Sequence, residues 1–119
     1  MGYLNSSYSC PVEATLDVIG GKWKGVILYH LLEGPQRFSD LKRHLPAITQ
    51  RMLTLQLREL ERDGIVHREI YQQIPPKVEY SLTEFGETLR PILLDMLNWG
   101  EQYTSRIVER KSAALAQSR

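Results

Sequence analysis

Five side chains on one predicted helix have the chemistry needed to read bases in duplex DNA. In the major groove, a glutamine can form two hydrogen bonds with adenine, and an arginine can form two with guanine. The five side chains are Thr49, Gln50, Arg51, Thr54 and Arg58. An amphipathic helix with a solvated charged face would show a similar composition, so the neighbouring elements must distinguish the two interpretations.

The helix that carries these residues is predicted to span residues 49–63, with Thr49 as its N-cap and Gly64 as its stop. Its core side is marked by leucines at helical spacing, Leu53, Leu57 and Leu60. The opposite face collects Arg51, Thr54, Leu55, Arg58 and Arg62. Because Glu59, Glu61 and Asp63 oppose phosphate at the C-terminal end, we expect the N-terminal half to enter the major groove.

Three predicted helices precede this one, and a predicted β-hairpin follows it. The helices span residues 11–19, 22–32 and 40–45, and Ser39 is the expected N-cap of the last. Arg37 and Phe38 form a short extended piece before it. Alternating β-branched residues predict strands at 65–70 and 78–82, joined by a turn at 72–76 that contains two prolines. This order is typical of a winged helix-turn-helix, a mainly α fold with a two-stranded hairpin wing.

The tip of the hairpin offers a second set of candidate contacts. Lys77 lies beside the tip and Gln73 lies within it. A cation and an amide at these positions could reach backbone phosphate or the minor groove. A hairpin that contacts only solvent is the alternative, and the wing interpretation depends on the helix interpretation being right.

Beyond the hairpin, the sequence predicts helices with two adjacent apolar stripes. Thr83 caps this region, Pro91 introduces a kink or break, and the polar tail at 110–119 frays. One stripe would serve the chain's own core, whereas two favour packing on a second copy as well. A helix buried within the monomer is the alternative. The expected dimer contacts are Leu93, Met96, Leu97, Trp99 and Tyr103.

Cys10 directly precedes the helix that is predicted to start at Pro11. As the cap of that helix, its sulfur would face backbone N–H groups that have no partner within the helix. That setting favours a reactive thiol, so Cys10 is a candidate for redox sensing. An inert cysteine is the alternative.

The composition indicates a single globular domain of 119 residues, 42% hydrophobic and 24% charged. We divide it into an arm (1–9), a winged-helix core (10–82), dimerisation helices (83–109) and the tail. The net charge is +1, but residues 37–77 carry eight Lys or Arg against five Asp or Glu. The single cysteine indicates a reducing compartment, and no segment resembles a signal peptide or a membrane span, so we expect a cytoplasmic protein without membrane contact.

No catalytic or metal-binding motif is recognisable in the sequence. His30, His44 and His67 lack metal-ligand spacing with Cys10, and the GGKW at 20–23 lacks the features of a phosphate loop. A nucleophile elbow and paired carboxylates are likewise missing. We therefore expect a protein that is not an enzyme and that uses no metal or cofactor.

The sequence resembles the HxlR-type transcriptional regulators, which are relatives of the MarR-like winged helices. The resemblance runs from about residue 10 to residue 103, and the order and spacing of its motifs are specific. The motifs are CPV at 10–12, IGGKW at 19–23, RFSDL at 37–41, ITQRML at 48–53, LRELERDGIV at 57–66, PPKVEYSLT at 75–83 and WG at 99–100.

This resemblance implies a bacterial homodimer whose terminal helices form the dimer and whose helix from Thr49 contacts the major groove. It also places Lys22 and Arg37 near phosphates. Some members sense electrophiles or oxidants at the position of Cys10. The chain has Lys77 where the family commonly has arginine, so the bidentate phosphate geometry is lost. With no second cysteine, oxidation would require an intermolecular disulfide or an adduct with a small thiol.

We therefore expect a homodimeric transcriptional regulator that binds a pseudo-palindromic operator in duplex DNA, with a small electrophile or another inducer as a candidate signal. One rival is a winged helix used for contact with another protein. A second rival is a redox or small-molecule sensor whose DNA role is secondary. The sequence leaves open the operator, the target genes, the inducer, and the choice between repression and activation.

Overall fold

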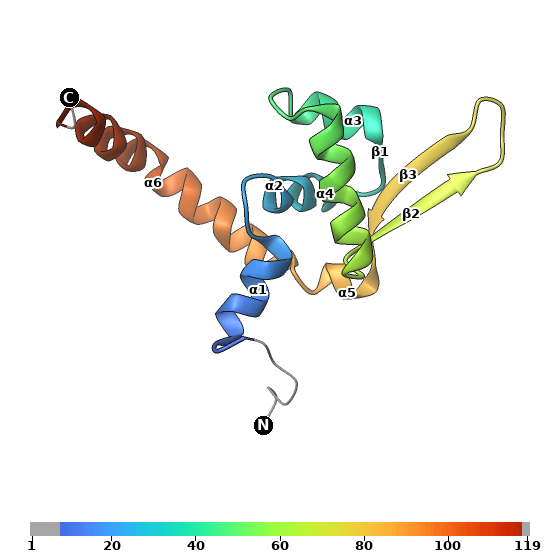
Figure 1. Cartoon of the computed structure of the whole chain (residues 1–119), viewed down its shortest axis with the longest axis horizontal. Coiled ribbons are helices and arrows are strands. Elements are labelled where there is room, and N and C mark those ends of the chain that lie inside the picture. Colours follow the sequence, from blue (N-terminus) through green and yellow to red (C-terminus); the bar gives the residue numbers. More distant parts are fainter. Residues whose placement is uncertain (1–7, 118–119) are drawn as a thin grey trace.

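The computed structural model describes residues 8–117, so the predicted arm lies mostly outside the described residues. The elements follow the order expected for a winged helix (Figure 1). They are α1 (Pro11–Ile19), α2 (Lys24–Leu31), β1 (Gln36–Arg37), α3 (Phe38–His44), α4 (Gln50–Arg62), β2 (Val66–Tyr71), β3 (Lys77–Leu82), α5 (Glu84–Glu87) and α6 (Arg90–Gln117).

The core lies where α2, α3 and α4 meet. The leucines predicted to form the core side of α4 are all buried there, which confirms the interpretation of its apolar face. They pack with Leu28 and Leu31 of α2 and with Leu41 of α3. Burial of these apolar side chains is the main favourable contribution to folding in a domain of this size. The core therefore holds α4 by one face and leaves the opposite face free.

Both ends of α4 are formed as the sequence predicts. The hydroxyl oxygen of Thr49 accepts a hydrogen bond from the backbone N–H of Met52 at 3.0 Å, which makes Thr49 the N-cap. At the other end, Gly64 has a φ of 77°, a left-handed conformation that glycine adopts without steric cost. The chain turns there and enters β2 directly, so the wing is attached close to the end of α4.

The start of α3 differs from the prediction of Ser39 as its N-cap. The helix begins at Phe38 with Arg37 as the N-cap, and Ser39 lies in the first turn. The carboxylate of Asp40 accepts a hydrogen bond from the backbone N–H of Arg37 at 3.0 Å and another from the side chain of Arg43 at 2.6 Å. Both bonds lower the pKa of Asp40, and the bond from the backbone of Arg37 has the larger effect. A carboxylate at the third helical position can replace a capping hydroxyl, and the prediction was therefore wrong by two residues.

The sheet has three strands in the order β1-β3-β2, rather than the two strands predicted. Gln36 pairs with Tyr80 and Arg37 pairs with Glu79, so the short extended piece before α3 joins the wing. Its backbone groups thereby gain hydrogen-bond partners that a free segment would lack. The strands β2 and β3 extend away from the body of the molecule as a long hairpin (Figure 1).

The break predicted near Pro91 is present. Thr83 caps α5 by accepting a hydrogen bond from the backbone N–H of Gly86 at 2.9 Å, and α5 ends at Glu87. A new helix, α6, then begins at Arg90, so that Pro91 occupies its first turn, where a missing N–H has no cost. In Figure 1, α6 projects away from the body on the side opposite the hairpin. It remains helical through Gln117, so the fraying predicted for the tail is not seen there.

Candidate nucleic-acid interface

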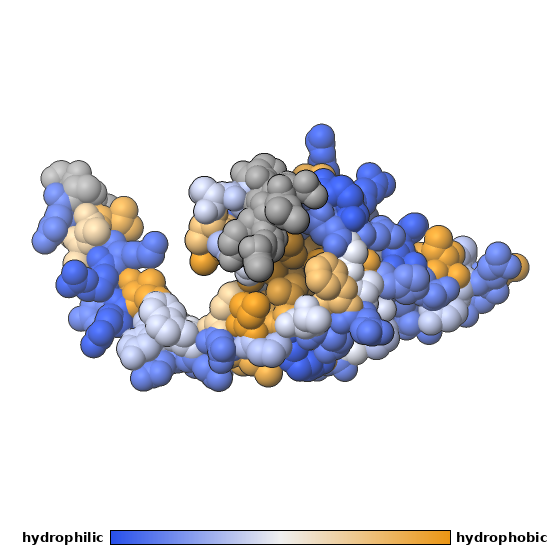
Figure 2. All heavy atoms as spheres, turned by 90° about the horizontal axis from the view of Figure 1, so that it is seen from below, coloured by the Kyte–Doolittle hydropathy of each residue, from blue (hydrophilic) through white to orange (hydrophobic). Residues whose placement is uncertain are grey.

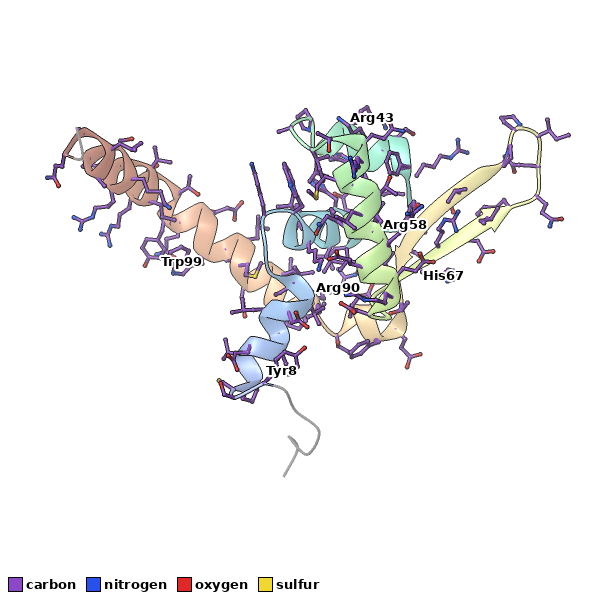
Figure 3. The ribbon with its side chains drawn as sticks, viewed as in Figure 1. Tyr8, Arg43, Arg58, His67, Arg90 and Trp99 are labelled. Carbon is purple, nitrogen blue, oxygen red and sulfur yellow. The ribbon has the colours of Figure 1, made fainter. Side chains whose placement is uncertain are left out.

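The exposed face of α4 brings together the five residues that the sequence singled out for base recognition. With two neighbours they line one shallow hollow of about 650 Å³. The lining residues are Thr49, Gln50, Arg51, Met52, Thr54, Leu55 and Arg58. Since the core holds the opposite side of α4, the structure leaves this hollow open to solvent. Arg58, one of its lining residues, extends from α4 on the side of the hairpin (Figure 3).

Hydrogen bonds inside α4 determine which donors and acceptors of these side chains remain available to a ligand. The hydroxyl of Thr54 donates to the backbone carbonyl of Gln50 at 2.9 Å, so it can act toward a ligand only as an acceptor. The oxygen of Thr49 accepts from the helix backbone and keeps its hydrogen for donation. The side chains of Gln50 and Arg51 are exposed. Arg58 is exposed as well, so these three side chains keep the capacity for bidentate contacts.

Ion pairs compensate two of the three acidic side chains at the C-terminal end of α4. The carboxylate of Glu59 turns toward α2 and pairs with Lys24 at 2.7 Å, and Asp63 pairs with Arg62 at 3.2 Å. The charge of Glu59 is thus compensated by Lys24, so it opposes phosphate less than the sequence predicts. Within residues 8–117, Arg51 and Arg58 form no ion pair.

Lys77, in contrast, is held by its own strand pair. Its ammonium group lies 3.3 Å from the carboxylate of Glu79 and 4.9 Å from the ring centroid of Tyr71. A hydrogen bond with the same carboxylate raises the pKa of Tyr71. Gln73 and Ile74 occupy the tip, and both are exposed. The structure thus places the predicted cation on the stem of the hairpin and a neutral, partly apolar surface at its end.

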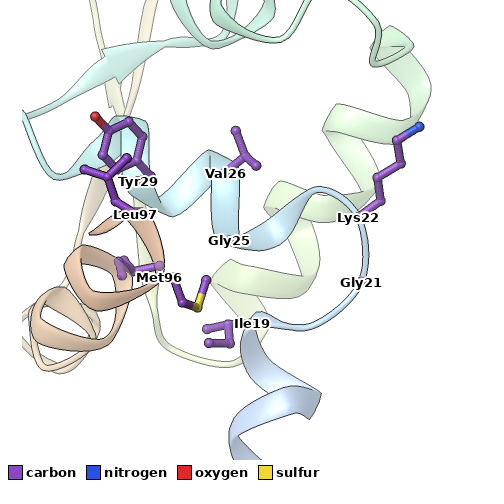
Figure 4. Close-up of a pocket in the computed structure, with 9 residues that line it drawn as sticks. Ile19, Gly21, Lys22, Gly25, Val26, Tyr29, Met96 and Leu97 are labelled. Atoms are coloured by element: carbon purple, nitrogen blue, oxygen red, sulfur yellow. The ribbon is translucent and has the colours of Figure 1, made fainter. Parts of the chain in front are cut away.

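The other two predicted phosphate contacts lie outside the hollow on α4. Arg37 is exposed at the N-cap of α3. Lys22 lies in the turn before α2, 4.8 Å from the ring centroid of Trp23. It also lines a pocket of about 310 Å³ between α2 and α6 (Figure 4). The structure therefore does not gather all the predicted cations into one site.

The predicted dimer contacts on α6 separate into two groups. Leu93 is only 2% exposed and belongs to the core of its own chain, so it was wrongly assigned to the interface. Leu97 and Tyr103 are half-buried, whereas Met96 and Trp99 are exposed. Hydrophobic side chains gather in the hollow between α6 and the body of the molecule (Figure 2). The exposed side of α6 near Met96 is thus an apolar surface that has no partner within the described part of a single chain.

Cys10 is exposed at the N-cap of α1. The backbone N–H groups of Ser9 and Cys10 donate to the carboxylate of Glu13, at 2.6 and 3.0 Å. Hydrogen bonds from Ser9, the strongest of which comes from its hydroxyl, and from Cys10 lower the pKa of Glu13. These two N–H groups precede the helix, so their bonds to Glu13 leave open the prediction that the Cys10 sulfur faces the N–H groups of the first turn, and the thiol itself is accessible.

One basic residue near α4 was not among the DNA contacts predicted from the sequence. Arg68 of β2 lines a second, smaller notch of about 230 Å³ together with Arg58 of α4. A signal for it existed, because Arg68 lies two residues after the buried Val66 and side chains two apart share one face of a strand. The face of β2 that packs toward α4 thus carries the buried Val66 and, farther out, the cation of Arg68.

Among residues 8–117 there is no helix long and apolar enough to cross a membrane. The same residues contain no cluster of three or more His, Cys, Asp or Glu side chains that could hold a metal ion. The rings of His30 and His44 stack with their centroids 4.4 Å apart, in a face-to-face pair between α2 and α3.

Comparisons with known proteins agree on one family. The model of the HxlR-like helix-turn-helix family matches residues 18–108. The HTH-type transcriptional regulator YdeP of Bacillus subtilis strain 168 is 63% identical over 110 residues, which are 92% of this chain and 86% of that protein.

Solved structures of regulators are also similar to this chain. The redox regulator HypR in its oxidised form is 71% identical, with a TM-score of 0.77, over 78% of this chain and 96% of the other. Its reduced form is 65% identical, with a TM-score of 0.80, over 84% and 99%. A protein of Enterococcus faecalis V583 assigned to the MarR family of regulators is 38% identical, with a TM-score of 0.72, over 92% and 99%.

Proposed function

Because the chain belongs to the HxlR-like helix-turn-helix family of transcriptional regulators, we propose that it acts by binding an operator in duplex DNA as a homodimer. The observation that carries this proposal is the exposed face of α4, where Arg51 and Arg58 line one hollow without an ion pair within the described residues. Uncompensated guanidinium groups on a helix held only by its other face are suited to bind an anionic polymer.

In this proposal, the N-terminal half of α4 enters the major groove. Gln50 and Arg51 read base edges, because both side chains are exposed and can form two hydrogen bonds each. Thr54 accepts a hydrogen bond from a base donor, since its own hydrogen is occupied within the helix. Contacts from the wing and from α3, including Gln73, Lys77 and Arg37, fix the orientation on the backbone.

The second copy of the chain packs on α6 in this proposal. Met96 and Trp99 are large apolar side chains that remain exposed in the single chain. Burying them against a partner would remove apolar surface from water and place two copies of α4 on successive half-sites. An operator with two-fold symmetry follows from a two-fold symmetric dimer.

Redox control through Cys10 is a further part of the proposal. It is supported by the exposure of the thiol and by the similarity to HypR, which is named a redox regulator and was solved in oxidised and reduced forms. The thiols of two Cys10 residues would form a disulfide by losing two protons and two electrons to an oxidant. A small cellular thiol can replace the second Cys10 in the same reaction.

The decisive experiment measures binding to duplex DNA as a function of salt, with variants of α4. We expect affinity to fall steeply with salt, because bound cations release counterions from DNA. We also expect Arg51→Ala to weaken binding about tenfold while the fold is retained. Arg110→Ala, which removes the same charge from the exposed end of α6, is the matched control. Weak, salt-independent binding to every duplex would instead favour a winged helix that contacts another protein.

A further inference from the structure

A notch between the recognition helix and the wing brings two arginines from different elements together. Arg58 extends from α4 and Arg68 from β2, and both line the same cavity of about 230 Å³. Figure 3 shows Arg58 on the side of α4 that faces the hairpin. The remaining lining residues are Thr54, Leu57, Glu61 and Tyr80.

The pleat of the wing directs Arg68 into this notch. Val66, two residues earlier on the same strand face, is buried in the core. Tyr80, which pairs with Arg68 across the strands, also lines the notch. The position of Arg68 therefore follows from the register of β2 and β3 rather than from a freely chosen side-chain conformation.

The charges around the notch are not balanced by the protein itself. Within residues 8–117, neither Arg58 nor Arg68 forms an ion pair. Two acidic residues near the end of α4 have partners of their own, since Glu59 pairs with Lys24 and Asp63 pairs with Arg62. Glu61 is the single carboxylate that lines the notch, against two guanidinium groups. Two positive charges at the same site repel each other, and an anion bound between them replaces this repulsion with attraction to both. Guanidinium groups bind phosphate oxygens through paired N–H donors.

We propose that Arg58 and Arg68 together bind one backbone phosphodiester of the operator, which makes Arg68 a DNA contact on the stem of the wing. This inference rests on the proposed function. Thr54 and Arg58 line both the notch and the hollow on α4, so the two sites are continuous. A phosphate at the wall of the groove that α4 enters would therefore lie within reach of the notch. Free inorganic phosphate has the same chemistry, but it could bind in the notch alone. The continuity between the notch and the hollow on α4 therefore favours a phosphate of the DNA backbone.

The test combines Arg68→Gln with neutralisation of single phosphates. The probe is a duplex selected by the wild-type protein from a random library, carrying one methylphosphonate at a time. We expect Arg68→Gln to lower affinity about three- to tenfold and to reduce the slope of log affinity against log salt by about 1. At one position in each half-site, a methylphosphonate should lower the DNA affinity of the wild-type protein by the same factor as Arg68→Gln. The same methylphosphonate should cause no further loss of affinity in Arg68→Gln or Arg58→Gln. Thermal unfolding of each variant confirms that it is folded.

Two controls separate this inference from its alternatives. Arg110→Gln, with the same loss of charge on α6, should show no coupling to any single phosphate. In an NMR titration, the Nε–H signals of both arginines should shift with the duplex and not with millimolar inorganic phosphate. Shifts with inorganic phosphate alone, together with unchanged DNA affinity in Arg68→Gln, would assign the notch to a free anion and overturn the proposal.

The failure of this inference can be distinguished from failure of the proposed function. If Arg68→Gln binds like the wild type with an unchanged salt slope, while Arg51→Ala is weakened, the notch is not a DNA contact and the regulator assignment stands. If the wild-type protein binds no duplex in a salt-dependent way, the proposed function itself fails.

Discussion

The ammonium group of Lys24 lies 2.7 Å from the carboxylate of Glu59, and this ion pair joins α2 to α4 at the margin of the core. The side chain of Lys24 is 11% exposed and that of Glu59 is 30% exposed. The pair withdraws a negative charge from the outer face of α4 and connects the element that carries the arginines to the rest of the domain. The hydrogen bond from Lys24 and its positive charge lower the pKa of Glu59.

The first prediction concerns pH. Because the folded-state pKa of Glu59 lies below its ordinary value of 4.5, the ion pair stabilises the fold above that value. Its contribution is lost as the pH falls through 4.5 to the lowered pKa. We expect Glu59→Gln to reduce the free energy of unfolding at neutral pH and the difference from the wild type to shrink in acid. Denaturant unfolding at a series of pH values measures this difference.

The control for that experiment is Glu61→Gln on the same helix, since Glu61 forms no ion pair within the described residues. An acid-dependent difference of the same size in Glu61→Gln, or one for Glu59→Gln that is independent of pH, would contradict the role assigned to the Lys24 pair.

The second prediction concerns the dimer. Trp99→Lys places a charge on the exposed apolar side of α6, so it should convert the protein to monomers that remain folded. Light scattering measures the mass. Ile74→Lys, a comparable change at the exposed tip of the wing, should leave the dimer intact. Leu93→Ala, by comparison, should reduce the stability of each chain by about 2–5 kcal/mol, because Leu93 is buried in the core. A dimeric Trp99→Lys protein would exclude this surface.

The third prediction concerns the wing. Since the carboxylate of Glu79 holds Lys77 at 3.3 Å, Glu79→Gln should free the lysine for phosphate. We expect DNA affinity to rise about two- to fivefold and its salt dependence to become steeper. The double variant Glu79→Gln with Lys77→Gln should lose this gain. If affinity rises equally in the double variant, the effect comes from removing a repulsive charge and not from Lys77.

The fourth prediction concerns oxidation. Treatment with a disulfide-forming oxidant should release the wild-type protein from DNA, whereas Cys10→Ser should stay bound, because Cys10 is the single cysteine of the chain. Binding in a gel-shift assay and the masses of the oxidised species under non-reducing conditions measure this. Added salt should release both proteins equally. Release of Cys10→Ser by the oxidant would show that Cys10 is not the switch.

The local features of the recognition helix could be predicted from the sequence because their causes lie within a few residues. Leucines at helical spacing identify the buried side of α4, Thr49 caps its start, and Gly64 permits the left-handed turn at its end. The same reasoning identified the wing and the break at Pro91, since prolines act on the adjacent backbone. It also placed Arg51 and Arg58 on the face opposite the core, and both are exposed.

The tertiary structure alone decided which charges remain free and which apolar residues remain exposed. Glu59 and Lys77 looked like a competing anion and an available cation, but Glu59 pairs with Lys24 of α2, and Lys77 pairs with Glu79 two residues along β3. Arg68 comes beside Arg58 because β2 packs against α4, and Leu93 turns into the core because α6 packs against α2. Apart from the Lys77–Glu79 pair, which lies within one strand, these arrangements depend on contacts between segments far apart in the chain, which local spacing does not determine.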